Sequence, residues 1–313
     1  MDVEILSAVR EDELVSRLTR RLPEGGRVIA GAGDDCAVVR VPSRKELQLL
    51  KTDCLVENVH FLRDHPAEKV GWKALCRTIS DIAACGGKPD SALVTLAAPQ
   101  ELAVPWVEAL YRGLSRAARR YGISIVGGET ARSPGGVFLS VALTGWVKPG
   151  RLVLRSGGRA GNFLFVTGRL GGSFGADGVG HHLSFVPRVE EARWLVRNFS
   201  VRAMMDLSDG LGADLPRLAD ASRKGYELDL AAIPLRPGCT IEQAAGDGED
   251  YELLFAIDPD EAESLLRRWR RKFPRVPLTH IGSLLANRKR RTALMPGYTH
   301  FSGCQHPPES GST

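Results

Sequence analysis

Apolar residues recur along the chain with two different spacings, one typical of helices and one of strands. In the first half, spacings of three and four predict helices at Glu11–Leu22, Pro66–Ala84 and Val104–Tyr121. Short apolar runs between them predict strands at Val28–Ile29, Ala37–Val41, Leu47–Leu50, Ala92–Ala97, Ser124–Val126 and Gly136–Val147. In the second helix, Asp81 lies off the apolar stripe of Leu75, Ile79 and Ile82, so its carboxylate can face either a cleft or solvent.

The second half repeats this strand–loop–helix pattern after a turn-rich junction that begins at Pro149-Gly150. Its predicted strands are Asn162–Thr167, Ala203–Asp206, Tyr226–Leu230 and Tyr251–Ile257, and its predicted helices are Glu190–Phe199, Leu211–Ser222 and Pro259–Trp269. A hairpin of Ile281–Ala286 and Thr292–Met295 is expected to follow. The whole pattern predicts an α+β fold with an N-terminal domain at 1–148, a C-terminal domain at 149–304 and a flexible tail at 305–313.

Acidic residues beside glycines and strand ends are the most informative chemical feature of the chain. They occur in six short segments: Gly31–Asp35, Thr52-Asp53, Ser80-Asp81, Gly127–Thr130, Asp206–Gly210 and Gly248–Tyr251. One Asp-Gly pair is an ordinary turn, but six such segments favour a shared role. Carboxylates next to closely approaching backbone are suited to holding Mg²⁺ against phosphate.

Composition narrows the class of protein. The 313 residues, with 43% hydrophobic and 25% charged residues, are typical of a globular protein with two domains. No apolar run approaches the roughly 20 residues of a membrane span, and Asp2 and Glu4 are unlike a signal peptide, so we expect a cytoplasmic protein. The six cysteines are scattered, which favours reduced thiols over a zinc site or disulfides.

The net charge of +5 comes largely from basic runs at Arg267–Lys272 and Arg288–Arg291. Because the first run falls on a predicted helix and the second on a predicted hairpin tip, we favour a solvated surface over a nucleic-acid interface. The glycine-rich fingerprints of dinucleotide and P-loop sites do not occur in the sequence, since Gly31-Ala-Gly33 continues with Asp-Asp-Cys. Any phosphate binding is therefore expected to be mediated by metal ions on carboxylates.

The ordered set of motifs resembles the thiamine-monophosphate kinase family of the aminoimidazole-ribotide-synthetase-like superfamily. The matching segments are Gly31–Val39, Thr52–Phe61, Trp72–Gly86, Gly127–Thr130, Arg155–Gly157, Ala203–Leu211, Gly248–Glu252 and Gly297–Phe301. The resemblance implies transfer of the γ-phosphoryl group of ATP to thiamine monophosphate. It also implies an N-terminal domain whose sheet pairs with that of a second subunit, and a C-terminal α/β domain that closes over the nucleotide.

The resemblance also implies a role for individual residues. The Mg²⁺ ligands would be Asp35, Thr52, Asp53, Asp81, Glu129, Asp206 and Asp209. ATP would contact Gly128, Glu129, Arg155 and Ser208, with Asp209 and Arg155 as the catalytic residues. The acceptor would contact His60, Glu249 and Tyr298.

The chain departs from the family pattern at a few positions. Lys51 stands where a small hydroxyl residue is usual, and a cation there would compete with or replace one Mg²⁺. Glu129 replaces an aspartate, and Met295-Pro296 precedes the last motif where an aromatic ring is often found. The stretch Gly171–Val186 is shorter than the usual insert.

Simpler interpretations of single residues stay open at this point. Ser208 and Asp209 could cap the following helix, His60 could be a packed histidine, and Arg155 could bridge to a surface acid. Alternative functions are an ATP-dependent ligase of the purine-synthesis type, a paralogue with another acceptor, and a non-catalytic nucleotide sensor.

Overall fold

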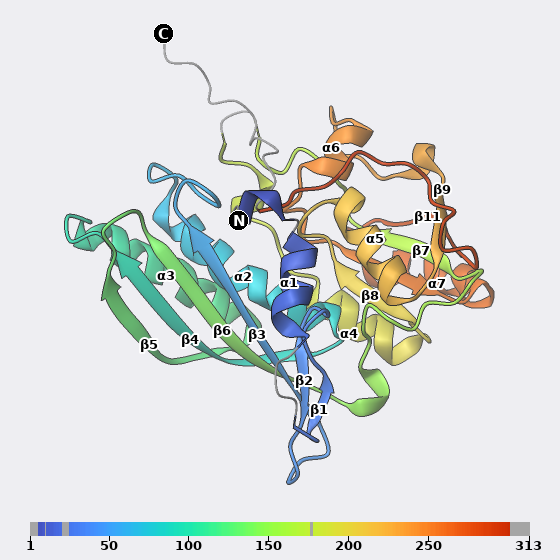
Figure 1. Cartoon of the computed structure of the whole chain (residues 1–313), viewed down its shortest axis with the longest axis horizontal. Helices are drawn as coiled ribbons and strands as arrows, with labels where there is room; N and C mark the ends of the chain where they lie inside the picture. The colour runs from blue at the N-terminus through green and yellow to red at the C-terminus, as the bar shows by residue number, and fades with distance from the viewer. Residues whose placement is uncertain (1–5, 10, 21–24, 176–177, 301–313) are drawn as a thin grey trace, which may run out of the picture.

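The computed structural model describes residues 6–9, 11–20, 25–175 and 178–300 (Figure 1). The end of the first predicted helix, Phe301 and the tail expected at 305–313 lie outside these residues. Two sheets form the frame. The first has strand order β1-β2-β3-β6-β4-β5, with β1 Val28–Ala30, β2 Ala37–Arg40, β3 Leu47–Val56, β4 Lys88–Ala98, β5 Ser124–Arg132 and β6 Phe138–Val147.

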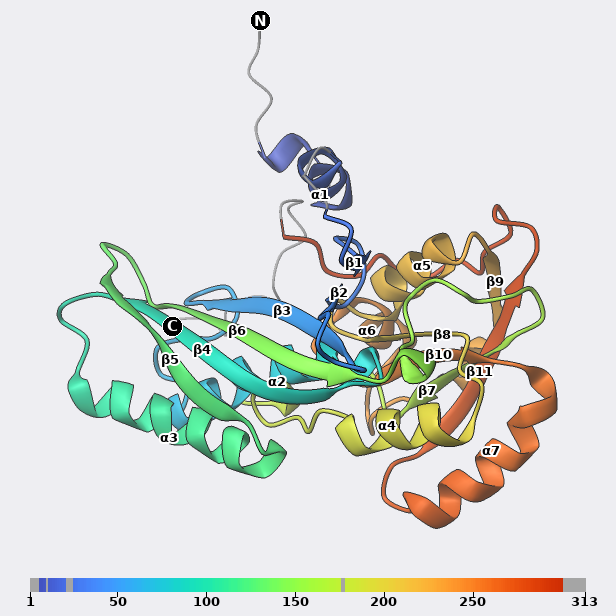
Figure 2. The same ribbon diagram turned by 90° about the horizontal axis from the view of Figure 1, so that it is seen from below.

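Two long helices cover one face of this first sheet. Helices α2 (Ala67–Ala84) and α3 (Val104–Tyr121) lie below the sheet in Figure 2, and α1 (Glu11–Thr19) lies on the other side. The helices approach closely because each has a glycine at the crossing. A Cβ on Gly71 would lie 1.9 Å from the Leu110 carbonyl oxygen, and one on Gly113 would lie 2.0 Å from the Glu68 oxygen.

Several strands are longer than predicted, and for two of them this changes the setting of a candidate ligand. Strand β3 pairs with β6 along its whole length, from Leu47–Val147 to Val56–Phe138, so Asp53 lies within a strand and not after one. Strand β5 likewise continues through Glu129, because it pairs in parallel with β4. The prediction ended both strands where the apolar run ends, but ladder hydrogen bonds do not depend on the side chains.

The second sheet has strand order β8-β10-β7-β11-β9 and is antiparallel throughout. Its strands are β7 Phe163–Thr167, β8 Ala203–Asp206, β9 Gly225–Leu228, β10 Leu253–Ile257 and β11 Leu278–Leu285. The helices are α4 Val189–Asn198, α5 Leu211–Ala221, α6 Ile241–Gly246 and α7 Pro259–Lys272. Apolar residues of α4 and α7 pack on one face of the sheet and those of α5 and α6 on the other, so the C-terminal half has three layers.

The predicted C-terminal hairpin is wrong in its second strand. Strand β11 already has β7 and β9 as neighbours, so no free edge is left for Thr292–Met295 beside it. The chain after β11 turns instead and meets the far side of β9, where Thr292 donates its backbone N–H to the carbonyl of Tyr226 at 3.1 Å. The residues that follow run back across α5 towards the first domain (Figure 1).

Candidate active site

Three buried carboxylates form an acid group between the two sheets. Asp35 lies just before β2, Asp81 lies on α2 and Asp206 ends β8. Their ligand oxygens lie within 4.8 Å of one another. Asp81 is 6% exposed, so the possibility that it is a solvated surface residue is wrong. The chain thus places acids from three distant segments at one point.

These carboxylates fit a divalent cation. The Asp35 Oδ2 atom is buried and has no hydrogen-bond partner within the described part of the chain. Burial and the neighbouring Asp35 raise the pKa of Asp206 to about 6, which reflects the cost of clustering like charges away from water. A cation with oxygen ligands, such as Mg²⁺, would satisfy both the free oxygen and the excess negative charge.

Two basic side chains lie against this group of acids. The Lys51 ammonium contacts Asp81 Oδ1 at 2.7 Å, and Arg77 Nε lies 3.1 Å from Asp53 Oδ2. A terminal nitrogen of Arg77 also donates to the carbonyl of Cys54 at 3.1 Å. Burial lowers the pKa of Lys51, but the carboxylates of Asp81 and Asp53 outweigh it and the net pKa is raised. Both groups therefore carry full positive charge at neutral pH.

Arg155 binds two acids of the N-terminal domain. Its guanidinium donates to Asp35 Oδ1 at 2.6 and 3.0 Å, and its backbone N–H donates to the Asp34 carboxylate at 3.2 and 3.3 Å. The partner Asp35 is buried, so the alternative that Arg155 only meets a surface acid is wrong. The guanidinium lies directly beside the candidate metal ligands.

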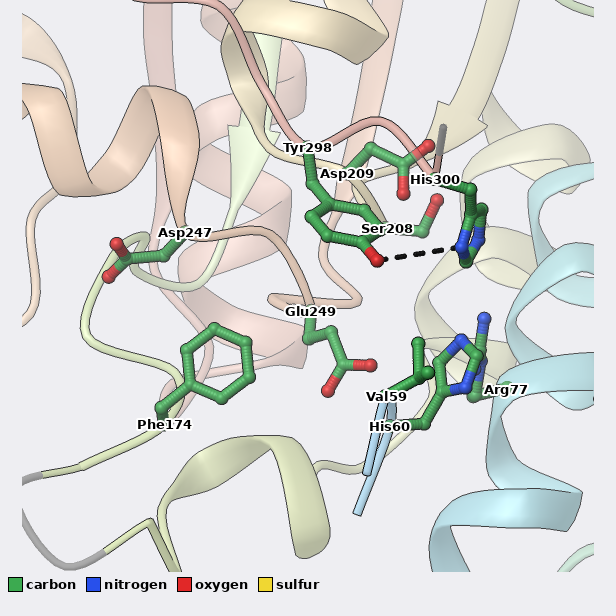
Figure 3. A pocket seen from close by; sticks show the side chains of 10 residues that line it. All are labelled: Val59, His60, Arg77, Phe174, Ser208, Asp209, Asp247, Glu249, Tyr298 and His300. Carbon is green, nitrogen blue, oxygen red and sulfur yellow. Dashed lines mark hydrogen bonds between the residues drawn. The ribbon is translucent and has the colours of Figure 1, made fainter. Parts of the chain in front are cut away.

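An open pocket contains all three predicted acceptor contacts (Figure 3). It is lined by Val59, His60, Arg77, Phe174, Ser208, Asp209, Asp247, Glu249, Tyr298 and His300. These residues come from the loop after β3, from α2, from the loops after β7 and β8, from the segment before β10 and from the C-terminal segment. Sequence-distant motifs therefore meet in one cavity between the domains.

His60 is held as a neutral ring at the pocket wall. Its Nδ1 accepts the backbone N–H of Val56 at 2.9 Å, so the ring hydrogen lies on Nε2. Burial lowers its pKa to about 3, assisted by the positive charge of Arg77. His60 can therefore donate a hydrogen bond from Nε2 but is not protonated at neutral pH.

Glu249 is anchored by a buried lysine that the sequence analysis did not identify. The Lys73 ammonium, with no exposed side-chain surface, contacts Glu249 Oε2 at 2.5 Å, the His60 carbonyl at 2.6 Å and His182 Nδ1 at 3.0 Å. Burial raises the pKa of the Glu249 carboxyl, but Lys73, His182 and Arg77 outweigh it and hold the pKa well below its usual range. Glu249 thus presents a permanent negative charge to the pocket.

Asp209 faces the pocket next to an arginine. Its carboxylate pairs with Arg217, which also contacts Asp214 at 2.9 Å. The buried Asp214 accepts the backbone N–H groups of Ser208 and Asp209 at 3.0 and 2.9 Å. Helix α5 begins at Leu211 and has Gly210 as its N-cap, with no side-chain cap, so the capping interpretation of Ser208 and Asp209 is wrong.

Three residues that the resemblance assigns to metal or ATP binding lie away from this site when a single copy of the chain is considered. Thr52 follows Lys51 on β3, so it points to the opposite sheet face, where its hydroxyl lies 3.4 Å from that of Ser140. Gly128 and Glu129 lie on β5, and β6 and β4 separate this strand from β3. At about 4.8 Å per strand spacing, Glu129 lies roughly 14 Å across the sheet from β3.

Two basic residues of the site, Lys73 and Arg77, share a sequence pattern with the predicted ligand Asp81. Lys73, Arg77 and Asp81 are spaced by four residues and share one side of α2, although most of this helix is buried. Charged residues at helical spacing on a buried helix indicate a polar site and not a solvated face. Arg217, Asp214 and His182 had no comparable signal, because only the fold brings them to the motifs.

Comparison with known proteins agrees with this geometry. Residues 33–147 match the family model of the AIR synthase related protein N-terminal domain, and residues 152–290 match the corresponding C-terminal domain. Thiamine-monophosphate kinase of Rhodopirellula baltica is 38% identical over 285 residues, covering 85% of this chain and 86% of the relative. The same enzyme of Aquifex aeolicus is 37% identical over 276 residues, covering 80% and 85%.

Solved structures give the same result. AaThiL in complex with AMPPCP and TMP matches with a TM-score of 0.82 and 31% identity, over 96% of this chain and 100% of that chain. The hydrogenase maturation protein HypE of E. coli, at 22% identity and a TM-score of 0.67 over 83% of this chain and 87% of that chain, shares the fold. With its motifs in order, its two domains matched and its curated relatives at up to 38% identity, this chain belongs to the thiamine-monophosphate kinase family.

Proposed function

We propose that this chain transfers the γ-phosphoryl group of ATP to thiamine monophosphate and forms thiamine diphosphate. The observation that carries the proposal is the pocket in which His60, Glu249 and Tyr298 lie together with Ser208 and Asp209. The relatives named as thiamine-monophosphate kinases support the same reaction, as does the related structure with an ATP analogue and TMP.

The pocket suits an acceptor that is cationic at one end and anionic at the other. The charged Glu249 and the rings of Phe174 and Tyr298 offer a place for a positively charged heteroaromatic ring such as thiazolium. The guanidinium of Arg77 and the neutral Nε2–H of His60 offer donors to a phosphate. The acceptor would thus lie with its phosphate towards the acid group and the nucleotide.

The acid group would hold Mg²⁺ through Asp35 and Asp206, with Asp81, Asp53 and Asp209 nearby. When bound, Mg²⁺ supplies the positive charge that lets two polyanions approach. Arg155 and Ser208 would contact ATP, and Asp209 would lie at the transferred group. The acceptor phosphate has a second pKa near 6 and is mostly dianionic at neutral pH, so phosphoryl transfer needs alignment more than a general base.

A homodimer would bring the remaining predicted ligands to the site. The face of the first sheet opposite α2 and α3 exposes Leu50, Leu93 and Phe138, which favours a partner of the same kind. A second copy could present its own Gly128 and Glu129 near Thr52. Light scattering of the purified chain would measure this oligomeric state directly.

Among the described residues no helix is long and apolar enough to cross a membrane. A cytoplasmic location stays a prediction.

The test compares two acceptors at equal concentration with ATP and Mg²⁺. Thiamine monophosphate should consume ATP and yield the diphosphate, while free thiamine should give essentially no product, since an alcohol normally needs a catalytic base. Comparable turnover of free thiamine would overturn the mechanism. Turnover of neither compound would overturn the proposed acceptor and leave the family and fold unchanged.

A further inference from the structure

Four charged residues on β3 and α2 form two ion pairs that connect the strand to the helix. Lys51 and Asp53 are two residues apart on a strand and therefore face the same side of the sheet. Arg77 and Asp81 are four residues apart on a helix and therefore share one side of it. Since α2 covers this sheet face, Lys51 lies opposite Asp81 and Asp53 lies opposite Arg77.

These contacts involve the carboxylates of Asp53 and Asp81, which the family resemblance assigns as metal ligands. Asp81 Oδ1 lies 2.7 Å from the Lys51 ammonium, and Asp53 Oδ2 lies 3.1 Å from Arg77 Nε. A divalent ion on the same oxygens would have to lie beside a fixed positive charge. Desolvated charges a few ångströms apart repel strongly, so the two kinds of cation compete for these places.

The pairs leave the rest of the acid group free. Asp35 Oδ2 has no partner in the described structure, and Asp206 approaches it from the second domain. A divalent ion can therefore still bind towards Asp35 and Asp206. The two ion pairs occupy only the side of the acid group that lies against β3 and α2.

We infer that Lys51 and Arg77 are resident cations of the active site, which together supply the +2 charge of one divalent ion and take its place on Asp53 and Asp81. The inference deepens the proposed function and rests on it for the identity of the polyphosphate that these charges face. The enzyme would accordingly bind one divalent ion fewer than the same fold with uncharged residues at 51 and 77.

The competing explanation is that the two pairs only fasten α2 to β3. In that case, removal of the basic side chains changes stability but not the number of metal ions bound. Metal counting separates the two explanations, whereas activity alone does not.

The experiment counts Mn²⁺ bound to the full chain by the electron paramagnetic resonance signal of free Mn²⁺, with and without AMPPCP. The variant Lys51→Ser/Arg77→Ser should bind one more Mn²⁺ per chain than the wild type. The charge-preserving variant Lys51→Arg/Arg77→Lys should match the wild type. Lys148→Ser/Arg119→Ser, which removes two exposed basic residues of the same domain, should also match it.

Equal Mn²⁺ numbers in the wild type and the folded Lys51→Ser/Arg77→Ser variant would overturn the inference. Circular dichroism establishes folding. If this variant does not fold, Lys51→Ser alone should tighten Mn²⁺ binding at least tenfold, and unchanged binding would equally overturn the inference. Because the count without AMPPCP needs no turnover, its outcome is independent of whether thiamine monophosphate is the acceptor.

Discussion

Replacement of Lys73 by methionine tests how far the buried network holds the two domains and the pocket together. Methionine preserves the length and volume of the side chain but removes the charge and all three donors. The Glu249 carboxylate and the His60 carbonyl then lose a donor at 2.5 and 2.6 Å. Removing one partner of a buried ion pair costs about 3–5 kcal/mol.

The lower end of this range applies, because Glu249 keeps some contact with solvent and with His182 at 3.1 Å. A loss of about 3 kcal/mol in the free energy of unfolding corresponds to a melting temperature roughly 4–5 °C lower for a chain of this size. The unpaired Glu249 will also tend to take up a proton. The KM for thiamine monophosphate should therefore increase along with the loss of stability.

Calorimetry on Lys73→Met and on Lys69→Met gives the comparison, because Lys69 lies one turn earlier on α2 and is partly exposed. The control should change stability by less than about 1 kcal/mol. The double variant Lys73→Met/Glu249→Gln should recover part of the loss, since it leaves no unpaired charge. If the free energy of unfolding of Lys73→Met lies within about 1 kcal/mol of that of the control, the network does not carry the stability assigned to it.

Three further results are expected. Asp209→Asn should lower kcat roughly 10²–10³-fold with only a small change in melting temperature, because Arg217 keeps its contact with Asp214, and wild-type kcat at low Mg²⁺ would contradict its assignment. Gly113→Ala should destabilise the protein by about 2 kcal/mol or more, because the new Cβ would meet the Glu68 carbonyl at 2.0 Å, whereas Gly150→Ala, in open space, should be close to neutral. Between pH 6.5 and about 3 the unfolded chain binds a proton at His60 that the folded chain does not, so stability should fall as the pH falls, by up to about 1.4 kcal/mol per pH unit from this group. His60→Asn should remove this contribution, while that of His181, whose pKa burial lowers to about 4, should remain.

Much of the fold followed from the spacing of apolar residues. Helix α3 and strand β8 have the predicted bounds, and α2 begins at Ala67, directly after Pro66. The errors arose where the sheet decides the outcome. Strand β3 continues through Asp53 because β6 pairs with it, and the segment at Thr292–Met295 forms no strand beside β11 because both edges of β11 are taken.

The site was predictable where motifs carry their own chemistry and not where the fold supplies a partner. His60, Glu249 and Tyr298 came from motifs and lie in one pocket. The spacing of Lys73 with Arg77 and Asp81 marks a polar side of α2, but it does not identify the partner of the lysine. Its role depends on Glu249, 176 residues further along the chain, and such a contact leaves no local pattern.

The ion pairs that join the domains also limit how ligands enter and leave. Lys73 on α2 holds Glu249 of the second domain, and Arg155 of the second domain holds Asp35 of the first. A hinge motion that parted the domains would have to break both ion pairs at once, and both would have to form again on closing. The two pairs therefore oppose a wide opening of the domains. We expect substrate and product to exchange through the mouth of the pocket, by local rearrangement of its walls.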